Sequence, residues 1–261
     1  MVNRLVAEHV AFEYSNGLAA LVDASLELAR GELVAVIGPN GSGKSTFLRC
    51  LAGLLVPKSG TVVVDGEDVV TLPPRERACR LAVVPQFLPR LPDVRVQDFV
   101  LGGRYAHLGR WRSATQHDRA VVRAALSSCD AADVESRLMS ELSGGQRQRV
   151  LVARAIAQEA GVLLVDEPTN SLDPEHQLAV FRSIAELVAG GRSALVVTHD
   201  LNLASQFASR AIVMQAGRTI TEGPVDRVLT REVLEPVYGP HLFFGRFASG
   251  RPIVVPWADA R

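Results

Sequence analysis

A glycine-rich segment near the amino terminus has the residue types that bind phosphate. Its residues are, in order, Gly38, Pro39, Asn40, Gly41, Ser42, Gly43, Lys44, Ser45 and Thr46. Because glycine adopts backbone conformations closed to other residues, such a loop bends tightly and brings its N–H groups close to phosphate oxygens. The pattern predicts that Lys44 reaches the β- and γ-phosphates of a nucleotide and that Ser45 binds Mg²⁺. A chance glycine cluster would rarely supply the Lys-Ser pair as well.

Two adjacent carboxylates follow an apolar run in the middle of the chain. Asp166 and Glu167 come directly after residues 162–165, which read Val-Leu-Leu-Val. Open α/β sheets bind their ligands at the carboxyl ends of the strands. Asp166 is therefore predicted to hold Mg²⁺, mostly through water, and Glu167 to activate a water molecule as a general base. Carboxylate pairs at strand ends are common, so this interpretation depends on the phosphate loop.

A second glycine turn lies far downstream of the first. It consists of Leu142, Ser143, Gly144, Gly145 and Gln146. The apolar pattern of residues 146–158 predicts a helix that begins directly after this turn, so that its amino terminus can face a phosphate. Arg147 and Arg149 lie on that helix. We expect them to orient the helix or to pair with acids rather than to read nucleic-acid bases.

The elements that must position these residues can be located from short apolar runs. Runs rich in valine and leucine occupy residues 33–37, 81–84, 162–165, 194–197 and 212–214. They predict strands of a mostly parallel sheet that is buried on both faces. Residues 87–142 have few strand-like runs and show helical patterns near 96–103 and 119–129. This interval is predicted to be a helical subdomain inserted into the sheet.

Composition limits the class of protein. The chain has 261 residues, 48% of them hydrophobic, which is enough for a sizeable core. Its 28 Lys and Arg residues balance 28 Asp and Glu residues, so no basic excess points to a nucleic-acid partner. Cys50, Cys79 and Cys129 are widely spaced, and we expect buried thiols in a reducing compartment. Nothing reads as a signal peptide, and no apolar run reaches the roughly 20 residues of a membrane-spanning helix.

Together these motifs resemble the ATP-binding cassette of ABC transporters, in the family's order and over nearly the whole chain. The resemblance implies that Tyr14 stacks on adenine, that Gln86 senses Mg²⁺, water and the transmembrane partner, and that His199 contacts the γ-phosphate. Residues 142–146 match the family's signature motif, and Ser171-Leu172-Asp173 match the loop that crosses between two cassettes. Tyr14 could instead be a packing residue, and His199 a hydrogen-bonded residue at a strand end.

The resemblance also implies a dimer. In this family two cassettes stack head to tail, so Ser143 and Gly145 would donate to the nucleotide held by the Lys44 and Ser45 of a second copy. Gly144, Gln146 and Asp173 belong to the same implied contact region. ATP would favour the closed dimer, and its hydrolysis would release it.

The implied fold is an α/β P-loop cassette with a mostly parallel core sheet, an N-terminal antiparallel β region and an inserted helical subdomain. A single ATP-binding domain is expected over residues 1–261. Its catalytic core would comprise residues 1–86 and 160–235, and its helical subdomain, with the signature motif, residues 87–159. Residues 236–261 would form a short extension, in which the aromatic residues are expected to pack.

Three shorter stretches resemble importers of iron-siderophore complexes, haem and cobalamin. They are residues 75–78, 103–109 and 250–256. The resemblance implies two copies of this chain under two permease chains, at the cytoplasmic face of the cell membrane, with a periplasmic or lipid-anchored substrate-binding protein. His107 is expected to be a surface or packing histidine. Zinc and manganese importers have similar cassettes and are the nearest alternative.

Functions outside transport are less consistent with the sequence. A DNA-repair or chromosome-organising ATPase would need a coiled-coil or zinc-bearing insertion, and residues 86–143 are too short and lack heptads and cysteine pairs. A translation-associated protein of this type usually has two cassettes joined by a charged linker. A phosphate-loop kinase would have no use for the second glycine turn.

Overall fold

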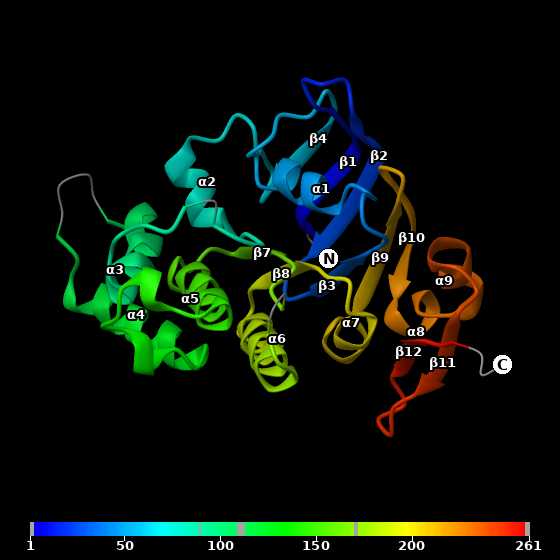
Figure 1. Cartoon of the computed structure of the whole chain (residues 1–261). Coiled ribbons are helices and arrows are strands. Elements are labelled where there is room, and N and C mark those ends of the chain that lie inside the picture. The colour runs from blue at the N-terminus through cyan, green and yellow to red at the C-terminus, as the bar shows by residue number, and fades with distance from the viewer. Residues whose placement is uncertain (1–2, 89, 109–112, 170–171, 259–261) are drawn as a thin grey trace. The chain divides into compact units, whose positions relative to one another are not determined.

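The computed structural model describes residues 3–88, 90–108, 113–169 and 172–258, which belong to two compact units (Figure 1). The first unit comprises Met1–Thr71 and Ser193–Arg261, and the second comprises Leu72–Arg192.

The first unit is built mainly from strands. Its elements are β1 (Asn3–Glu13), β2 (Ala19–Ala29), β3 (Leu33–Ile37), α1 (Lys44–Leu51), β4 (Ser59–Val64), β5 (Glu67–Asp68), β8 (Ser193–Val197), α7 (Leu201–Phe207), β9 (Arg210–Gln215), β10 (Arg218–Pro224), α8 (Val225–Val228), α9 (Arg231–Tyr238), β11 (Leu242–Arg246) and β12 (Pro252–Pro256).

The sheet of the first unit has the strand order β5-β4-β1-β2-β10-β9-β3-β8. β3 pairs in parallel with both β8 and β9, whereas β1 pairs antiparallel with β2 and β4. All five residues of β3 and of β8 are buried, as expected for aliphatic strands covered on both faces. β10 instead alternates exposed and half-buried residues. A parallel core with an antiparallel amino-terminal region is thus confirmed.

The second unit combines helices with two strands. Its elements are α2 (Pro74–Arg80), β6 (Leu81–Val84), α3 (Val96–Leu101), η1 (Gly102–Ala106), α4 (Gln116–Ser128), η2 (Ala132–Val134), η3 (Met139–Glu141), α5 (Gly144–Ala157), β7 (Val162–Asp166) and α6 (Pro174–Ala189). β6 and β7 pair in parallel, with Val84 opposite Val165. The predicted helices near residues 96–103, 119–129 and 146–158 correspond to α3, α4 and α5.

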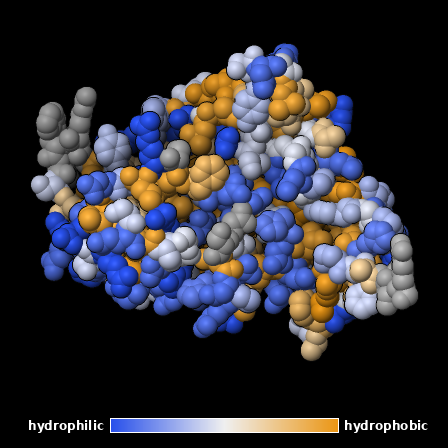
Figure 2. Space-filling view, in the orientation of Figure 1, coloured by the Kyte–Doolittle hydropathy of each residue, from blue (hydrophilic) through white to orange (hydrophobic). Residues whose placement is uncertain are grey.

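The last two strands form a separate hairpin. β11 and β12 pair antiparallel in a two-stranded sheet of their own. The predicted carboxyl-terminal extension therefore has a regular structure that the sequence did not indicate. Two of its aromatic residues pack on each other, with ring centroids of Phe243 and Trp257 6.0 Å apart, but each ring is more than half exposed. Figure 2 shows hydrophobic residues at the surface of this hairpin, at the lower right.

The three cysteines are free thiols, but the expectation that all are buried was wrong. Cys50 and Cys129 are buried, and burial raises their pKa values to about 11 and about 12. Cys79 is exposed, because it lies on α2, a helix with no buried residue. Among the described residues, no helix combines the length and the apolar character that crossing a bilayer requires.

Candidate active site

The first glycine-rich loop joins the buried strand β3 to helix α1. Gly38 has φ 151°, and a Cβ atom there would lie 2.1 Å from the carbonyl oxygen of Met214. Gly43, the residue before α1, has φ 98°, and its Cβ would lie 2.6 Å from the carbonyl oxygen of Ala20. Both positions therefore require glycine for space as well as for conformation. The loop can turn tightly against the neighbouring backbone only because these two residues have no side chain.

Lys44 lies inside this loop. Its Nζ donates to the carbonyl oxygens of Gly38 at 2.8 Å and Pro39 at 2.9 Å, and its distance to Ser42 Oγ is 3.5 Å. Only 5% of the residue is exposed. The loop thus wraps around a positive charge at the amino terminus of α1, where backbone N–H groups also favour an anion. This arrangement fits a phosphate group.

The other loop residues differ in exposure. Asn40 and Gly41 are exposed, whereas Ser42 is buried and Ser45 is half-buried. A Cβ on Gly41 would meet no atom within 4 Å. The open tip of the loop therefore leaves room for a ligand to approach the backbone.

Tyr14 lies beside the first turn of α1. Its hydroxyl is 3.1 Å from Oγ1 of Thr46, and its ring meets that of Phe12 edge-on, with centroids 4.9 Å apart. The half-buried ring is thus fixed to the helix that begins at Lys44. The structure brings Tyr14 to the loop, and stacking on adenine stays a prediction.

His199 occupies the turn between β8 and α7 and is exposed. The turn is held on both sides. Thr198 donates its N–H to Val36 of β3 at 3.1 Å, and its Oγ1 accepts from the N–H of Asp200 at 3.0 Å. Asp200 in turn caps α7, accepting from Asn202 and Leu203 N–H groups at 2.9 Å each.

In the second unit, the parallel strands β6 and β7 bring Gln86 and the two carboxylates together. Nε2 of Gln86 donates to Oε2 of Glu167 at 2.8 Å. Asp166 is the last residue of β7 and is 4% exposed. Glu167 has φ 46°, a left-handed conformation that costs a residue with a side chain about 1 kcal/mol or more. Strain of this kind is often found where a side chain must be aimed for function.

The signature turn forms the amino-terminal cap of α5. Ser143 Oγ accepts from the N–H of Gln146 at 3.2 Å, and Gln146 Oε1 accepts from the N–H of Ser143 at 3.1 Å. Ser143 and Gly144 are exposed, and Gly145 is half-buried, so the first turn of the helix is open to an anion. Farther along α5, Arg149 Nη1 pairs with Asp130 Oδ2 at 2.5 Å, which confirms the predicted pairing of this arginine with an acid.

Asp173 caps the next helix, α6. Its Oδ1 accepts from the N–H of His176 at 3.0 Å and from the ring at 2.7 Å. The backbone N–H of His176 lowers the pKa of this carboxyl, and the ring contact lowers it further. Ser171, which we also predicted for the crossing loop, lies outside the described residues, as does Gly109 of the stretch 103–109.

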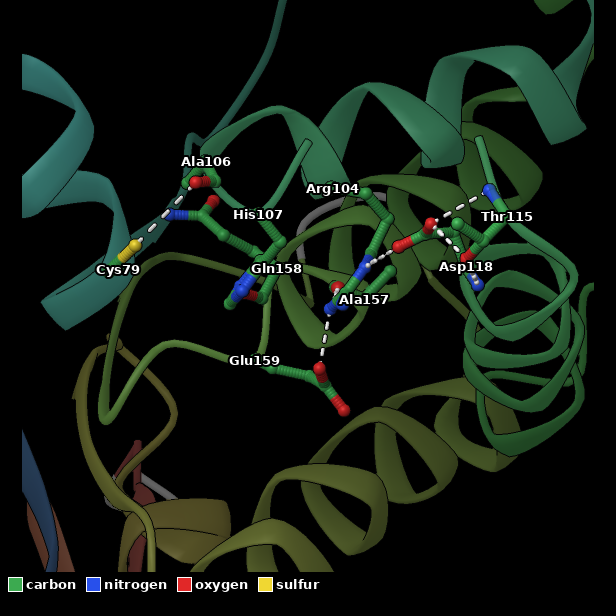
Figure 3. A network of polar contacts seen from close by, with 9 residues as sticks. All are labelled: Cys79, Arg104, Ala106, His107, Thr115, Asp118, Ala157, Gln158 and Glu159. Atoms are coloured by element: carbon green, nitrogen blue, oxygen red, sulfur yellow. Dashed lines mark hydrogen bonds and ion pairs between the residues drawn. The ribbon is translucent and has the colours of Figure 1, made fainter. Parts of the chain in front are cut away.

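A buried polar cluster in the second unit was not anticipated (Figure 3). Arg104 is 3% exposed and donates to Asp118 Oδ1 at 3.1 Å, to the carbonyl of Ala157 at 2.8 Å and to Glu159 Oε2 at 2.5 Å. It ties η1 to α4 and to the end of α5. The hydroxyl of Thr115 is the main cause that lowers the pKa of Asp118 to about 2, followed by the Thr115 N–H and the Arg104 guanidinium.

Neighbouring contacts give the stretch around Arg104 a structural role. His107 is exposed, and its Nε2 lies 2.7 Å from the carbonyl oxygen of Gln158, so it is a surface histidine as expected. Gln158 donates to the carbonyls of Ala78 at 2.6 Å and Leu81 at 2.9 Å, and Arg75 donates to Ala106 at 2.8 Å. Two of the three stretches that resemble importers thus meet in one network.

The donor set bears on which metal could bind. No group of three or more His, Cys, Asp or Glu residues within the described ranges could hold a metal ion. A site that offers one carboxylate, a hydroxyl and an amide suits Mg²⁺, which keeps several waters and binds substrate phosphates. Ser45, Gln86 and Asp166 have these chemical groups.

Comparison with known proteins agrees with this geometry. Residues 21–170 match the ABC transporter family. The hemin import ATP-binding protein HmuV of Pseudomonas entomophila is 42% identical over 84% of this chain and 86% of its own length. The ferric enterobactin transport ATP-binding protein FepC of Escherichia coli is 35% identical over 98% and 94%.

Among solved structures, an inward-facing putative metal-chelate type ABC transporter has a chain with a TM-score of 0.83. It is 29% identical, and the match covers 99% of this chain and 98% of that one. The match extends beyond residues 21–170 and so includes the carboxyl-terminal part. The chain therefore belongs to the ABC transporter family, as one of its ATP-hydrolysing cassettes.

Proposed function

We propose that this chain energises the uptake of a metal chelate, such as haem, an iron-siderophore complex or cobalamin, by hydrolysing ATP beneath a membrane permease. The observation that carries the ATPase assignment is the hydrogen bond of 2.8 Å from Gln86 to Glu167. It holds the carboxylate of Glu167 in place at the carboxyl ends of the parallel strands β6 and β7. Relatives that are named for hemin and ferric enterobactin support the class of cargo.

The principal predicted site residues have separate roles in this proposal. Lys44 and the N–H groups at the start of α1 bind the phosphates, and Tyr14 stacks on adenine. Glu167, aimed by Gln86, takes a proton from the attacking water. His199 contacts the γ-phosphate. Ser45, Asp166 and Gln86 would hold Mg²⁺, and the bound ion would supply positive charge to balance the negative charge of the phosphate oxygens.

The signature turn is proposed to act on the nucleotide of a second copy. Support comes from the exposed first turn of α5, whose N–H groups are open to an anion, and from the Ser143 cap that fixes it. Asp173 would lie in the crossing loop of that dimer. We also assign residues 87–159 to the subdomain that docks the permease, residues 1–86 and 160–235 to the catalytic core, and residues 236–261 to an extension.

The experiment is reconstitution of the chain with its permease and binding protein in liposomes. ATP hydrolysis should rise when the binding protein is loaded with haem, a ferric siderophore or cobalamin. Loading with zinc or manganese ions serves as the comparison. Stimulation by the free ions alone would contradict the proposed cargo class, and absence of any Mg²⁺-dependent hydrolysis would contradict the ATPase assignment itself.

A further inference from the structure

Helix α7, which follows His199, is held along its whole length by the carboxyl-terminal hairpin. Asn202 Nδ2 donates to the carbonyl of Val254 at 3.1 Å, and Val254 donates its N–H to Asn202 Oδ1 at 3.0 Å. One turn later Ser205 Oγ donates to the carbonyl of Pro252 at 2.7 Å. At the end of the helix, Arg251 Nη1 donates to the carbonyl of Ala208 at 3.2 Å.

The spacing of these contacts fits the periodicities of the two elements. Asn202 and Ser205 are three residues apart, and so lie on one face of α7. Val254 and Pro252 are two residues apart, and so lie on one face of β12. The contact is buried as well as bonded, because Ser205 is 0% and Val254 2% exposed. The hairpin therefore meets the helix in one defined register.

α7 depends on such support. It has only seven residues, fewer than the roughly 12 that a helix needs to be marginally stable alone in water. Packing must therefore fix its position. Asn202 contributes most clearly, because its amide pairs with both backbone groups of one residue, as a neighbouring strand would.

The position of α7 is transmitted to His199 through one residue. Asp200 accepts hydrogen bonds from the N–H groups of Asn202 and Leu203, and its own N–H is bonded to Thr198 Oγ1. The backbone on the carboxyl side of His199 is thus bonded to the first turn of α7. Asn202 is the residue that joins this turn to the hairpin.

We propose that the carboxyl-terminal hairpin positions His199 for ATP hydrolysis, with Asn202 as the positioning residue. This inference rests on the proposed ATPase function and adds a part of the molecule to it. Residues 250–256, which resemble importer cassettes, then have a role in hydrolysis that is independent of cargo. Their backbone carbonyls and N–H groups, together with Arg251, hold the helix that follows the histidine.

The test compares Asn202→Ala with Gln206→Ala in the full chain. Gln206 lies one turn farther along α7, is exposed, and bonds within the helix to the carbonyl of Asn202 at 3.3 Å. Asn202→Ala should lower kcat for Mg-ATP hydrolysis about tenfold and change KM by less than about twofold, since a small misplacement of a catalytic group is costly. Gln206→Ala should match the parent chain in both constants.

A double-mutant cycle of Asn202→Ala with His199→Ala distinguishes an effect on the position of His199 from a general loss of structure. In the His199→Ala background, Asn202→Ala should cause no further fall in kcat, because its effect passes through the histidine. An equal fall in both backgrounds would overturn the inference. Ser205→Ala is a second variant of the same contact. Like Asn202→Ala, it should lower kcat and leave KM unchanged.

Hydrogen exchange distinguishes failure of this inference from failure of the proposed function. Amides of residues 199–204 should exchange faster in Asn202→Ala than in Gln206→Ala, because the first turn of α7 opens more often. If the exchange rates are unchanged, the hairpin does not stabilise α7 through Asn202, even if the rate of ATP hydrolysis falls. Faster exchange with an unchanged kcat would refute its effect on hydrolysis. A parent chain without ATPase activity would refute the proposed function, and the inference with it.

Discussion

Gln86 donates a hydrogen bond from Nε2 to Oε2 of Glu167 over 2.8 Å. The two residues are far apart in sequence, and the parallel pairing of Val84 with Val165 brings them together. Glu167 is also held by its left-handed backbone conformation, with φ 46°. The hydrogen bond and the backbone conformation both restrict the position of this side chain, which supports the proposed role of Glu167 as the general base.

Replacing Glu167 by Gln should separate ATP binding from hydrolysis. The amide keeps the size of the side chain but cannot take a proton, so kcat should fall at least about 100-fold, while the Kd for Mg-ATP changes by less than about threefold. The stalled chain should elute as a dimer with ATP in size-exclusion chromatography. Glu186→Gln, which alters an exposed carboxylate on α6, is the control. Hydrolysis at the parent rate would show that Glu167 is not the base.

Gln86→Ala should have a smaller effect on the same step. Loss of the amide leaves the base in place but less well oriented, and we expect kcat to fall about tenfold. Combined with Glu167→Gln, the substitution should add little, because the two side chains act as one unit. Steady-state ATPase assays of the two single variants and the double variant measure this coupling. Fully additive losses would mean that Gln86 acts independently of Glu167.

Lys44→Ala should abolish nucleotide binding. The loop loses the ammonium group around which it is wrapped, and the phosphates lose their main cationic partner. The other lysine of the chain, Lys58, forms an exposed ion pair with Glu13 at 2.6 Å, and Lys58→Ala is the matched control. Titration calorimetry with Mg-ATP should give a Kd near the parent value for the control and no measurable binding for Lys44→Ala. Retained affinity would remove Lys44 from the site.

The sequence was sufficient to predict the elements whose patterns are local. The buried strands β3, β6 and β7 read as short aliphatic runs, and the two glycine turns are contiguous motifs. The network around Arg104 could not be predicted, because Asp118 lies on α4 and Glu159 in the turn after α5, and an isolated arginine usually reads as a surface residue.

The hairpin contact on α7 was hidden for a similar reason. Asn202 bonds to the backbone of Val254, and backbone groups leave no signal in side-chain identity. Residues 252–256 are also too short and proline-bounded to predict a strand with its partner. The signal that could have been noticed is the unassigned importer-like stretch 250–256.

Buried Asp118, bonded to Thr115 and to Arg104, should make the free energy of unfolding depend on pH in the acid range. The pKa of Asp118 is lowered from 3.8 to about 2, so its carboxylate stabilises the fold above pH 4, and this contribution declines as the pH falls toward 2. Asp118→Asn should cost at least about 2 kcal/mol of unfolding free energy at pH 7.

Urea unfolding between pH 3 and pH 7 measures this effect. The difference in unfolding free energy between the parent chain and Asp118→Asn should be constant from pH 7 to pH 5, and it should be smaller by about 1 kcal/mol at pH 3. Asp133 is exposed and serves as the control: the unfolding free energy of Asp133→Asn should stay within about 0.5 kcal/mol of the parent value. A difference that does not change with pH would show that Asp118 acts through packing rather than through its charge.

Mixing two inactive variants should restore ATP hydrolysis if the signature turn acts on the partner's nucleotide. Ser143→Arg places a bulky cation at the first turn of α5 and leaves the phosphate loop intact, whereas Lys44→Ala disables the loop and leaves the signature turn intact. A mixed dimer has one site with a working loop from one chain and a working turn from the other. Its second site has both defects.

An equal mixture should recover at most about a quarter of the parent activity, since about half of the dimers are mixed and each has one complete site. Each variant alone should stay inactive. Loss of the Ser143 cap should cost about 1 kcal/mol, so thermal melting must first show that Ser143→Arg is folded. A folded Ser143→Arg chain that still hydrolyses ATP, or a mixture with no recovery at any ratio, would show that the turn does not complete a shared site.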